Sequence, residues 1–257
     1  MRAPAPQGSV LVSAKNLLFS GGPPGGHDFG SLAAAVSALL GVDGIETEIV
    51  SDPGELEDRL TSTANRPDLL TVLALRWTMG APRYGRDRAE WAFSPDAATR
   101  SALEGFVAAG GGLLALHTAC VCFDDWREWG DLLGAAWEWD RSSHQPVGPA
   151  LVEPSGRDHP ITAMLPAFTV VDEIYEQLAV RPKLEPLLTS ARGARDEPVL
   201  WARAHGDGRV VVDTLGHDAA SWRQPVHQVI VRRSAAWALG LPDSQVRRIG
   251  EQGPPHE

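Results

Sequence analysis

Four histidines lie where a folded chain often carries chemistry, in predicted loops or at the ends of predicted strands. They are His27 in GGHDF, His117 in LHTA, His144 in SSHQP and His217 in LGHD. A neutral imidazole binds zinc and similar divalent metals, and it also transfers protons near neutral pH. Because no HExxH-like spacing links the four, three alternatives stay open: a metal site, a proton-transfer site, or hydrogen-bonded structural histidines.

Acidic residues accompany these histidines and could orient an imidazole ring or act as a general acid or base. The candidates are Asp28, Asp172, Glu173 and Asp218. In VVDEIY, Asp172 and Glu173 point to opposite faces if the strand continues through both, so only one can face the site. We prefer Glu173, with Asp218 as the second candidate beside His217, and a solvent-facing pair at a strand end as the alternative.

The tryptophan content suggests the type of substrate. Nine tryptophans are many for 257 residues, and indoles stack on the apolar faces of sugar rings. The tryptophans predicted to bind substrate are Trp77, Trp126 and Trp222. Core packing is the alternative for all of them, and we assign it to Trp137, Trp201 and Trp237.

Buried strands alternate with helical segments in the first half of the chain. Strands are predicted over residues 9–16, 45–50, 68–75 and 112–118, and helices over 31–40, 53–60 and from Ser94, an expected N-cap followed by Pro95. The second half is rich in strands and closes with a helix over Pro225–Leu239. The sequence therefore predicts an α/β fold with a doubly wound, mostly parallel sheet and a β-rich C-terminal portion. We expect a single domain over residues 9–240 and a C-terminal tail over 241–257.

The predicted parallel sheet explains how histidines far apart in the sequence can meet. Loops at the carboxyl ends of parallel strands converge on one crevice, and His27, His117 and His217 each follow a predicted strand. His144 would approach from the tryptophan-rich insertion WREWGDLLGAAWEWD. Convergence of three imidazoles would suit zinc or a similar metal with an open position for substrate, whereas two would favour proton transfer without metal.

Composition excludes several classes of partner. The formal net charge of −10 argues against a nucleic-acid or anionic-membrane surface. The loop GGPPGG lacks both GxxxxGK[ST] and GxGxxG, so no nucleotide cofactor is expected. Two cysteines, no signal-like start and no long apolar run predict a cytoplasmic protein with reduced thiols. A small-molecule ligand is expected, and a homo-oligomer stays open.

Five motifs occur in order between about Val10 and Gly240: GGGLLALHTA, WGDLLGAAW followed by a histidine, DHPIT with LPAFTVVDEIY, PVLWARAHGDGRVVVDTLGHD, and WRQP. Together they resemble the trehalose-utilisation (ThuA-like) family. The resemblance implies a class I glutamine amidotransferase-like, flavodoxin-like fold. It also places His117 at the turn that carries the amidotransferase nucleophile, and His217 at the later histidine. Because imidazole cannot form the thioester of glutamine hydrolysis, the resemblance argues against glutaminase activity.

Three functional hypotheses follow. The first is an enzyme of carbohydrate metabolism, a hydrolase or lyase acting on a sugar or keto-sugar, whose histidine-rich site replaces the amidotransferase cysteine. The second is a non-catalytic sugar-binding or regulatory module on the same fold. The third, which we disfavour, is an amidotransferase that uses Cys120.

Overall fold

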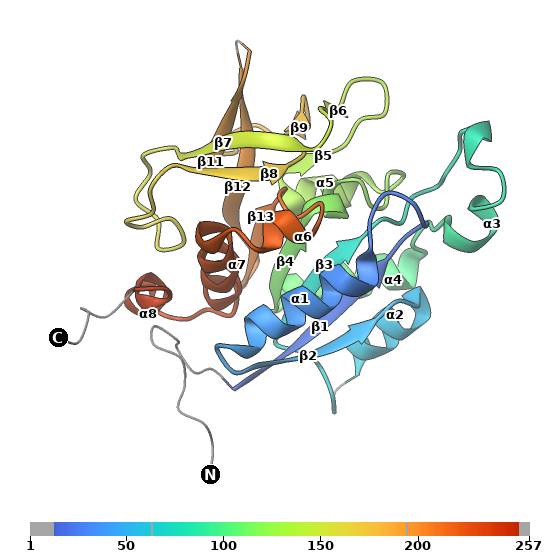
Figure 1. Ribbon diagram of the computed structural model, residues 1–257. Helices are drawn as coiled ribbons and strands as arrows, with labels where there is room; N and C mark the ends of the chain where they lie inside the picture. The colour runs from blue at the N-terminus through green and yellow to red at the C-terminus, as the bar shows by residue number, and fades with distance from the viewer. Residues whose placement is uncertain (1–12, 63, 194, 252–257) are drawn as a thin grey trace.

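A nine-stranded sheet forms the centre of the computed structural model, which describes residues 13–62, 64–193 and 195–251 (Figure 1). The strand order is β2-β1-β3-β4-β13-β12-β11-β7-β8. The parallel strands are β1 (Ala14–Gly21), β2 (Ile45–Val50), β3 (Leu69–Ala74), β4 (Gly112–Leu116) and β13 (Gly208–Asp213). The antiparallel strands that extend them are β12 (Arg195–His205), β11 (Pro186–Arg192), β7 (Gly148–Pro154) and β8 (Phe168–Asp172). The expected mixed α/β class is therefore confirmed.

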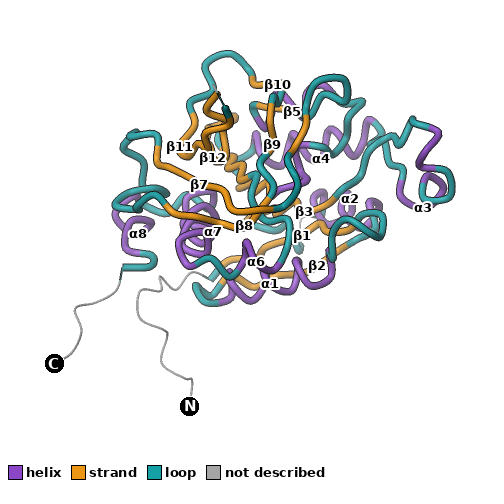
Figure 2. Tube along the Cα trace, turned by 45° about the horizontal axis from the view of Figure 1, so that its top comes forward, coloured by secondary structure: helices purple, strands orange, loops and turns teal. Residues whose placement is uncertain are grey.

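Helices cover both faces of the parallel strands, and the strand sequences show why. In β4, Leu113 and Ala115 pack on one hydrophobic core while Leu114 and Leu116 pack on the other. A strand buried on both faces must be apolar at every position. The first core contains residues of α2 (Pro53–Thr61), α4 (Ala97–Ala108) and α5 (Arg127–Leu133). The second contains residues of α1 (Phe29–Gly41) and α7 (Pro225–Ala238), which lie side by side in Figure 2.

Two short antiparallel ladders pair the tryptophan-rich insertion and the residues just after it with the segment that follows β8. Strand β5 (Ala135–Ala136) pairs with β10 (Ala179–Val180), and β6 (Ser143–His144) pairs with β9 (Tyr175–Glu176). The second ladder places His144 directly opposite Tyr175. The remaining short helices are η1 (Pro82–Tyr84), α3 (Arg88–Trp91), η2 (His117–Cys120), α6 (Ala219–Trp222) and α8 (Asp243–Arg248).

Two predicted element starts were wrong. The first strand begins at Ala14 and runs to Gly21, whereas we expected residues 9–16, of which 9–12 lie outside the described residues. The buried side chains of Leu17, Leu18 and Phe19 explain the later position. The N-cap of α4 is Asp96, whose carboxylate accepts from Thr99 N at 2.9 Å. Ser94 Oγ instead donates to the carboxylate of Asp125.

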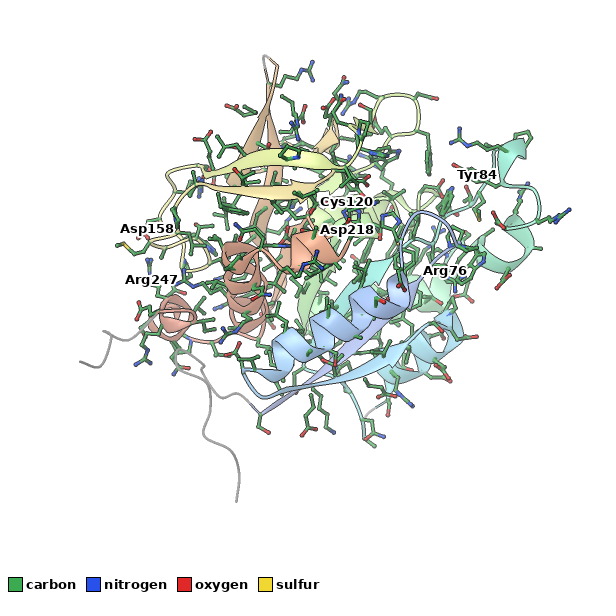
Figure 3. All side chains as sticks on the ribbon, viewed as in Figure 1. Arg76, Tyr84, Cys120, Asp158, Asp218 and Arg247 are labelled. Carbon is green, nitrogen blue, oxygen red and sulfur yellow. The ribbon has the colours of Figure 1, made fainter. Side chains whose placement is uncertain are left out.

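The expected C-terminal tail contains α8. Its Val246, together with Ile249, packs on Ala236 of α7. Arg247 of this helix forms an ion pair with Asp158 at 2.7 Å, and Figure 3 labels both side chains. Residues 241–251 therefore pack against the domain. Among the described residues, no helix is both long enough and apolar enough to cross a membrane.

An ion pair joins the end of α1 to α7. Arg232 donates from Nε and Nη2 to the two oxygens of Asp43, each at 2.7 Å, and Asp43 is 1% exposed. Removing one member of a buried pair leaves the other charge without its compensating partner.

We expect Asp43→Asn to lower the free energy of unfolding by about 3 kcal/mol, because Arg232 stays mostly buried without its carboxylate. Urea denaturation monitored by tryptophan fluorescence measures this. The control is Glu185→Gln, which removes an equally short but exposed ion pair with Arg157 and should leave stability unchanged. Equal effects of the two substitutions would contradict the role assigned to Asp43.

Candidate metal centre

Side chains that follow four different strands meet at the carboxyl ends of the parallel strands. His27 follows β1, His117 follows β4, Glu173 follows β8 and His217 follows β13. One ligand atom from each lies within 4.8 Å of the others, and Nε2 of His27 is 3.0 Å from Nε2 of His117. The predicted convergence of His117 and His217 is therefore observed as one cluster of side chains, with His27 as the third imidazole.

His117 is fixed in both conformation and tautomer. It begins the short helix η2 directly after β4 with φ of 46°, a value that few non-glycine residues adopt and that often marks functional sites. Its Nδ1 lies 2.9 Å from the carbonyl oxygen of Thr214. Since a carbonyl oxygen only accepts, Nδ1 carries a hydrogen, and Nε2 faces His27 and Glu173.

Glu173 is a carboxylate at 5% exposure and contacts three imidazoles. Its Oε1 is 3.4 Å from Nε2 of His117, and its Oε2 is 3.0 Å from Nδ1 of His144 and 3.4 Å from Nδ1 of His217. Burial alone would raise the pKa of Glu173, but the contacts with His117 and His217 outweigh burial and lower it. The carboxylate is thus held ionised inside the protein.

The pKa values of His27 and His217 shift in opposite directions. Burial, with the neighbouring His117 and His217, lowers the pKa of His27 to about 3, so its ring is neutral and free to act as a ligand. Contact with Glu173 raises the pKa of His217 against the effect of burial. Nδ1 of His217 is nevertheless buried without a partner in hydrogen-bond geometry, although Glu173 Oε2 lies 3.4 Å away. A buried nitrogen of this kind calls for a partner that the protein itself does not supply.

Asp172 positions the loop that carries His217, a role that the sequence analysis missed. Its buried carboxylate accepts from Gly216 N at 2.8 Å and from His217 N at 3.2 Å. Gly216 has φ of +118°, and a Cβ there would lie 2.7 Å from Trp222. The adjacent acids in VVDEIY could have indicated this role, because two neighbouring side chains at a strand end point in different directions. Asp172 holds the loop, and Glu173 enters the cluster.

Tyr175 was also missed. Its hydroxyl lies 3.4 Å from Nε2 of His117, and the two rings stack with centroids 5.1 Å apart. Burial and the nearby Glu173 raise the pKa of Tyr175 well above its ordinary value, so the phenol stays protonated. It can donate a hydrogen bond into the cluster.

The remaining predicted residues lie around the cluster. His144 is 45% exposed and reaches it through Glu173, outside the group of four possible ligands. Asp218, labelled in Figure 3, caps α6 by accepting from Ala220 N at 2.7 Å. Trp77, Trp126 and Trp222 are all buried. Trp222 and His217 line a cavity of about 690 Å³ between α1 and α6. Substrate binding by these tryptophans stays a prediction.

The sequence model of the trehalose-utilisation family, ThuA, matches residues 19–238. The chain belongs to the ThuA family. A ThuA-like protein from Parabacteroides merdae shares 16% identity, covers 95% of this chain and 94% of its own length, and superposes with a TM-score of 0.69. A ThuA-like protein from Bacteroides uniformis shares 19% identity, and the alignment covers 89% of this chain and 92% of that protein, with a TM-score of 0.66.

A β-galactosidase from Rahnella matches 90% of this chain over 32% of its own length, with 13% identity and a TM-score of 0.60. At these identities the ThuA family members and the galactosidase share the fold alone with this chain. No curated protein matches the sequence.

Both cysteines are free and buried, with Cys120 in η2 and Cys122 just after it. Burial raises the pKa of each thiol to about 12. A thiol in this state is a poor nucleophile, which weighs against an amidotransferase that uses Cys120.

We expect neither thiol of the native protein to react with a thiol reagent such as DTNB at pH 8, because both thiols are protonated and shielded. Protein unfolded in guanidinium without reductant should release two equivalents. Rapid reaction of the native protein, lost in Cys120→Ser, would instead identify Cys120 as an accessible nucleophile.

Proposed function

We propose that this chain is an enzyme that acts on a sugar or keto-sugar at a divalent-metal centre formed by His27, His117, His217 and Glu173. The observation that carries the proposal is the convergence of four ligand atoms within 4.8 Å. Three imidazoles and one carboxylate are a donor set that zinc and similar borderline metals accept.

The state of the donors supports a metal. His27 is neutral, Glu173 is ionised, and His217 offers a buried nitrogen without a hydrogen-bond partner. The carbonyl of Thr214 orients His117 from behind, as outer-shell groups do for metal-binding histidines.

The protein's own residues suggest how the chemistry is divided. A bound metal would polarise a carbonyl or hydroxyl oxygen of the substrate or acidify a water molecule. His144 is outside the ligand group, is exposed and contacts Glu173 at 3.0 Å, so it can exchange a proton with substrate. Tyr175 holds a proton beside His117 and can donate it in a hydrogen bond to a substrate oxygen.

The substrate class comes from the family. Its description, trehalose utilisation, concerns a carbohydrate, and neutral sugars supply the hydroxyl and carbonyl oxygens that such a centre would bind. A structural neighbour is described as a cytoplasmic protein from Salmonella typhimurium, and we propose the same compartment for this chain.

Metal binding is the first test. Chelator-treated protein should take up about one zinc ion per chain in isothermal titration calorimetry, with the metal measured by elemental analysis. His117→Ala should weaken zinc binding by more than about tenfold, because it removes a central ligand. His205→Ala, at the end of β12 and outside the cluster, is the control and should bind zinc as the unchanged protein does.

Circular dichroism checks that each variant is folded. Failure of the folded protein to bind any of zinc, manganese, cobalt or nickel would refute the metal centre. Zinc binding that His117→Ala leaves intact would do the same.

Turnover is the second test. The metal-loaded protein should convert at least one member of a panel of disaccharides and their 3-keto forms, as followed by chromatography of the products. His144→Gln should lower kcat by about a hundredfold with unchanged metal content, because it removes a proton-transfer group and no ligand. Tight sugar binding without turnover would instead support the non-catalytic binding module.

A further inference from the structure

A second cavity, of about 400 Å³, lies beside the antiparallel strands. Its lining comes from the loop after β7, the loop between β10 and β11, part of β12, and the residue that follows α5. One lining residue, Arg203 of β12, pairs with Val210 near the start of β13, whereas His217 follows the end of β13. In Figure 3, Asp158, whose neighbours in sequence line this cavity, lies well apart from Asp218 beside the histidine cluster. The cavity is therefore separate from the metal centre.

Cations outnumber carboxylates in the lining of this cavity. The cationic residues are Arg157, Arg181, Lys183 and Arg203, and the one carboxylate belongs to Glu185. We call this site the cationic cavity. Its charge contrasts with the formal net charge of −10 of the whole chain. A concave site with an excess of positive charge attracts anions and raises their local concentration.

Two of the four cations have carboxylate partners. Nε of Arg181 donates to Oδ1 of Asp131 at 2.5 Å, and Nη1 of Arg157 pairs with Glu185 at 2.7 Å. The side chains of Arg157 and Glu185 are 47% and 61% exposed, and an ion pair exposed to this extent contributes little stability. Arg157 can therefore turn to a bound anion at little cost, whereas Arg181 is held in place by Asp131.

The other two cations, Lys183 and Arg203, form no ion pair with any of the described residues. Nη1 of Arg203 donates at 2.6 Å to the backbone carbonyl oxygen of Asp131, which carries no net charge. Gly134 leaves room for this contact, since a Cβ there would lie 3.1 Å from Nη1 of Arg203. Lys183 has φ of 68°, a left-handed value that is uncommon outside glycine and clusters at functional positions. The cavity thus contains two positive charges without a compensating carboxylate.

The cationic cavity also offers a neutral hydrogen-bond donor and an apolar wall. Nδ1 of His159 accepts from Ile161 N at 3.3 Å, and burial lowers the pKa of this imidazole to about 4. The neutral ring therefore carries its hydrogen on Nε2. Leu184, Leu187 and Trp201 complete the lining. An anionic group attached to a small organic body matches this combination of donors and apolar surface.

We propose that the cationic cavity binds a small organic phosphate, namely a phosphate monoester, at a site that is independent of the metal centre. A phosphate monoester carries close to two negative charges at neutral pH and three acceptor oxygens. It can therefore compensate both Lys183 and Arg203, whereas a monocarboxylate would compensate only one of them. Guanidinium and ammonium groups are the side chains that proteins use to bind phosphate. The proposal does not depend on the proposed function.

The test is isothermal titration calorimetry at low ionic strength. The full chain is treated with chelator and dialysed, so that no metal competes for phosphate. The ligands are inorganic phosphate and glycerol 3-phosphate, with glycerol as the uncharged comparison. Both phosphates should bind at one site per chain and glycerol should not bind. Sodium chloride at about 0.15 M should weaken binding, because it screens the exposed cations.

Substitution of Lys183 identifies the site. Lys183→Ala should weaken phosphate binding by about fivefold, because it removes one positive charge near the ligand and no ion pair within the protein. Lys183→Arg keeps the charge and should bind phosphate nearly as the unchanged protein does. The other lysine of the chain, Lys15, is exposed on β1. Lys15→Ala is therefore the matched control and should leave phosphate binding unchanged.

Three results would overturn the proposal. The first is that the folded chain binds neither phosphate, and the second is that Lys183→Ala leaves phosphate binding intact. The third is a loss of phosphate binding in His117→Ala, which would place the phosphate at the histidine cluster instead. Circular dichroism checks that each variant is folded. Because zinc binding is measured separately, failure of the cationic cavity is distinguishable from failure of the metal centre.

Discussion

The buried carboxylate of Glu173 is the constraint around which this site is arranged. An ionised group at 5% exposure is tolerated only when opposite charge or hydrogen-bond donors surround it. Those partners come from three separate segments: His117 after β4, His144 in β6 and His217 after β13. Strand β8 belongs to the antiparallel extension of the sheet, and Glu173 follows it directly. Both halves of the fold are therefore needed to build one cluster.

The loop that carries His217 is fixed by a second group of buried polar contacts. Asp213 accepts from Leu215 N at 3.0 Å and pairs with His227 at 3.1 Å, and His227 contacts Ser221 Oγ at 3.2 Å. This serine, histidine and aspartate resemble a catalytic triad in composition, but all three are at most 1% exposed and face the core. With Asp172 they hold the backbone between β13 and α6, which orients Thr214 toward His117.

The sequence predicted the parts of the structure that depend on local patterns of apolar residues. Continuous apolar runs identified the buried parallel strands, and the rule that their carboxyl ends converge brought His27, His117 and His217 together. The sequence did not indicate Tyr175 or the cationic cavity. Tyr175 enters the site through the two-residue ladder of β9 with β6, which is too short to produce a periodic pattern. The cationic cavity, and the burial of Trp77, Trp126 and Trp222, depend on how the loops fold over one another.

The turn after β4 shows how one fold can carry different chemistry. A strained residue with positive φ at the end of a buried strand projects its side chain into the crevice. A cysteine there would present a nucleophile, whereas His117 presents a nitrogen whose direction is fixed by the carbonyl of Thr214. The two cysteines that follow are turned into the core, where Cys122 Sγ donates to Ala74 O at 2.9 Å. Under the proposed function, this turn would use His117 and the carboxylate of Glu173 opposite it to hold a cation, in place of the covalent catalysis that a cysteine would carry out.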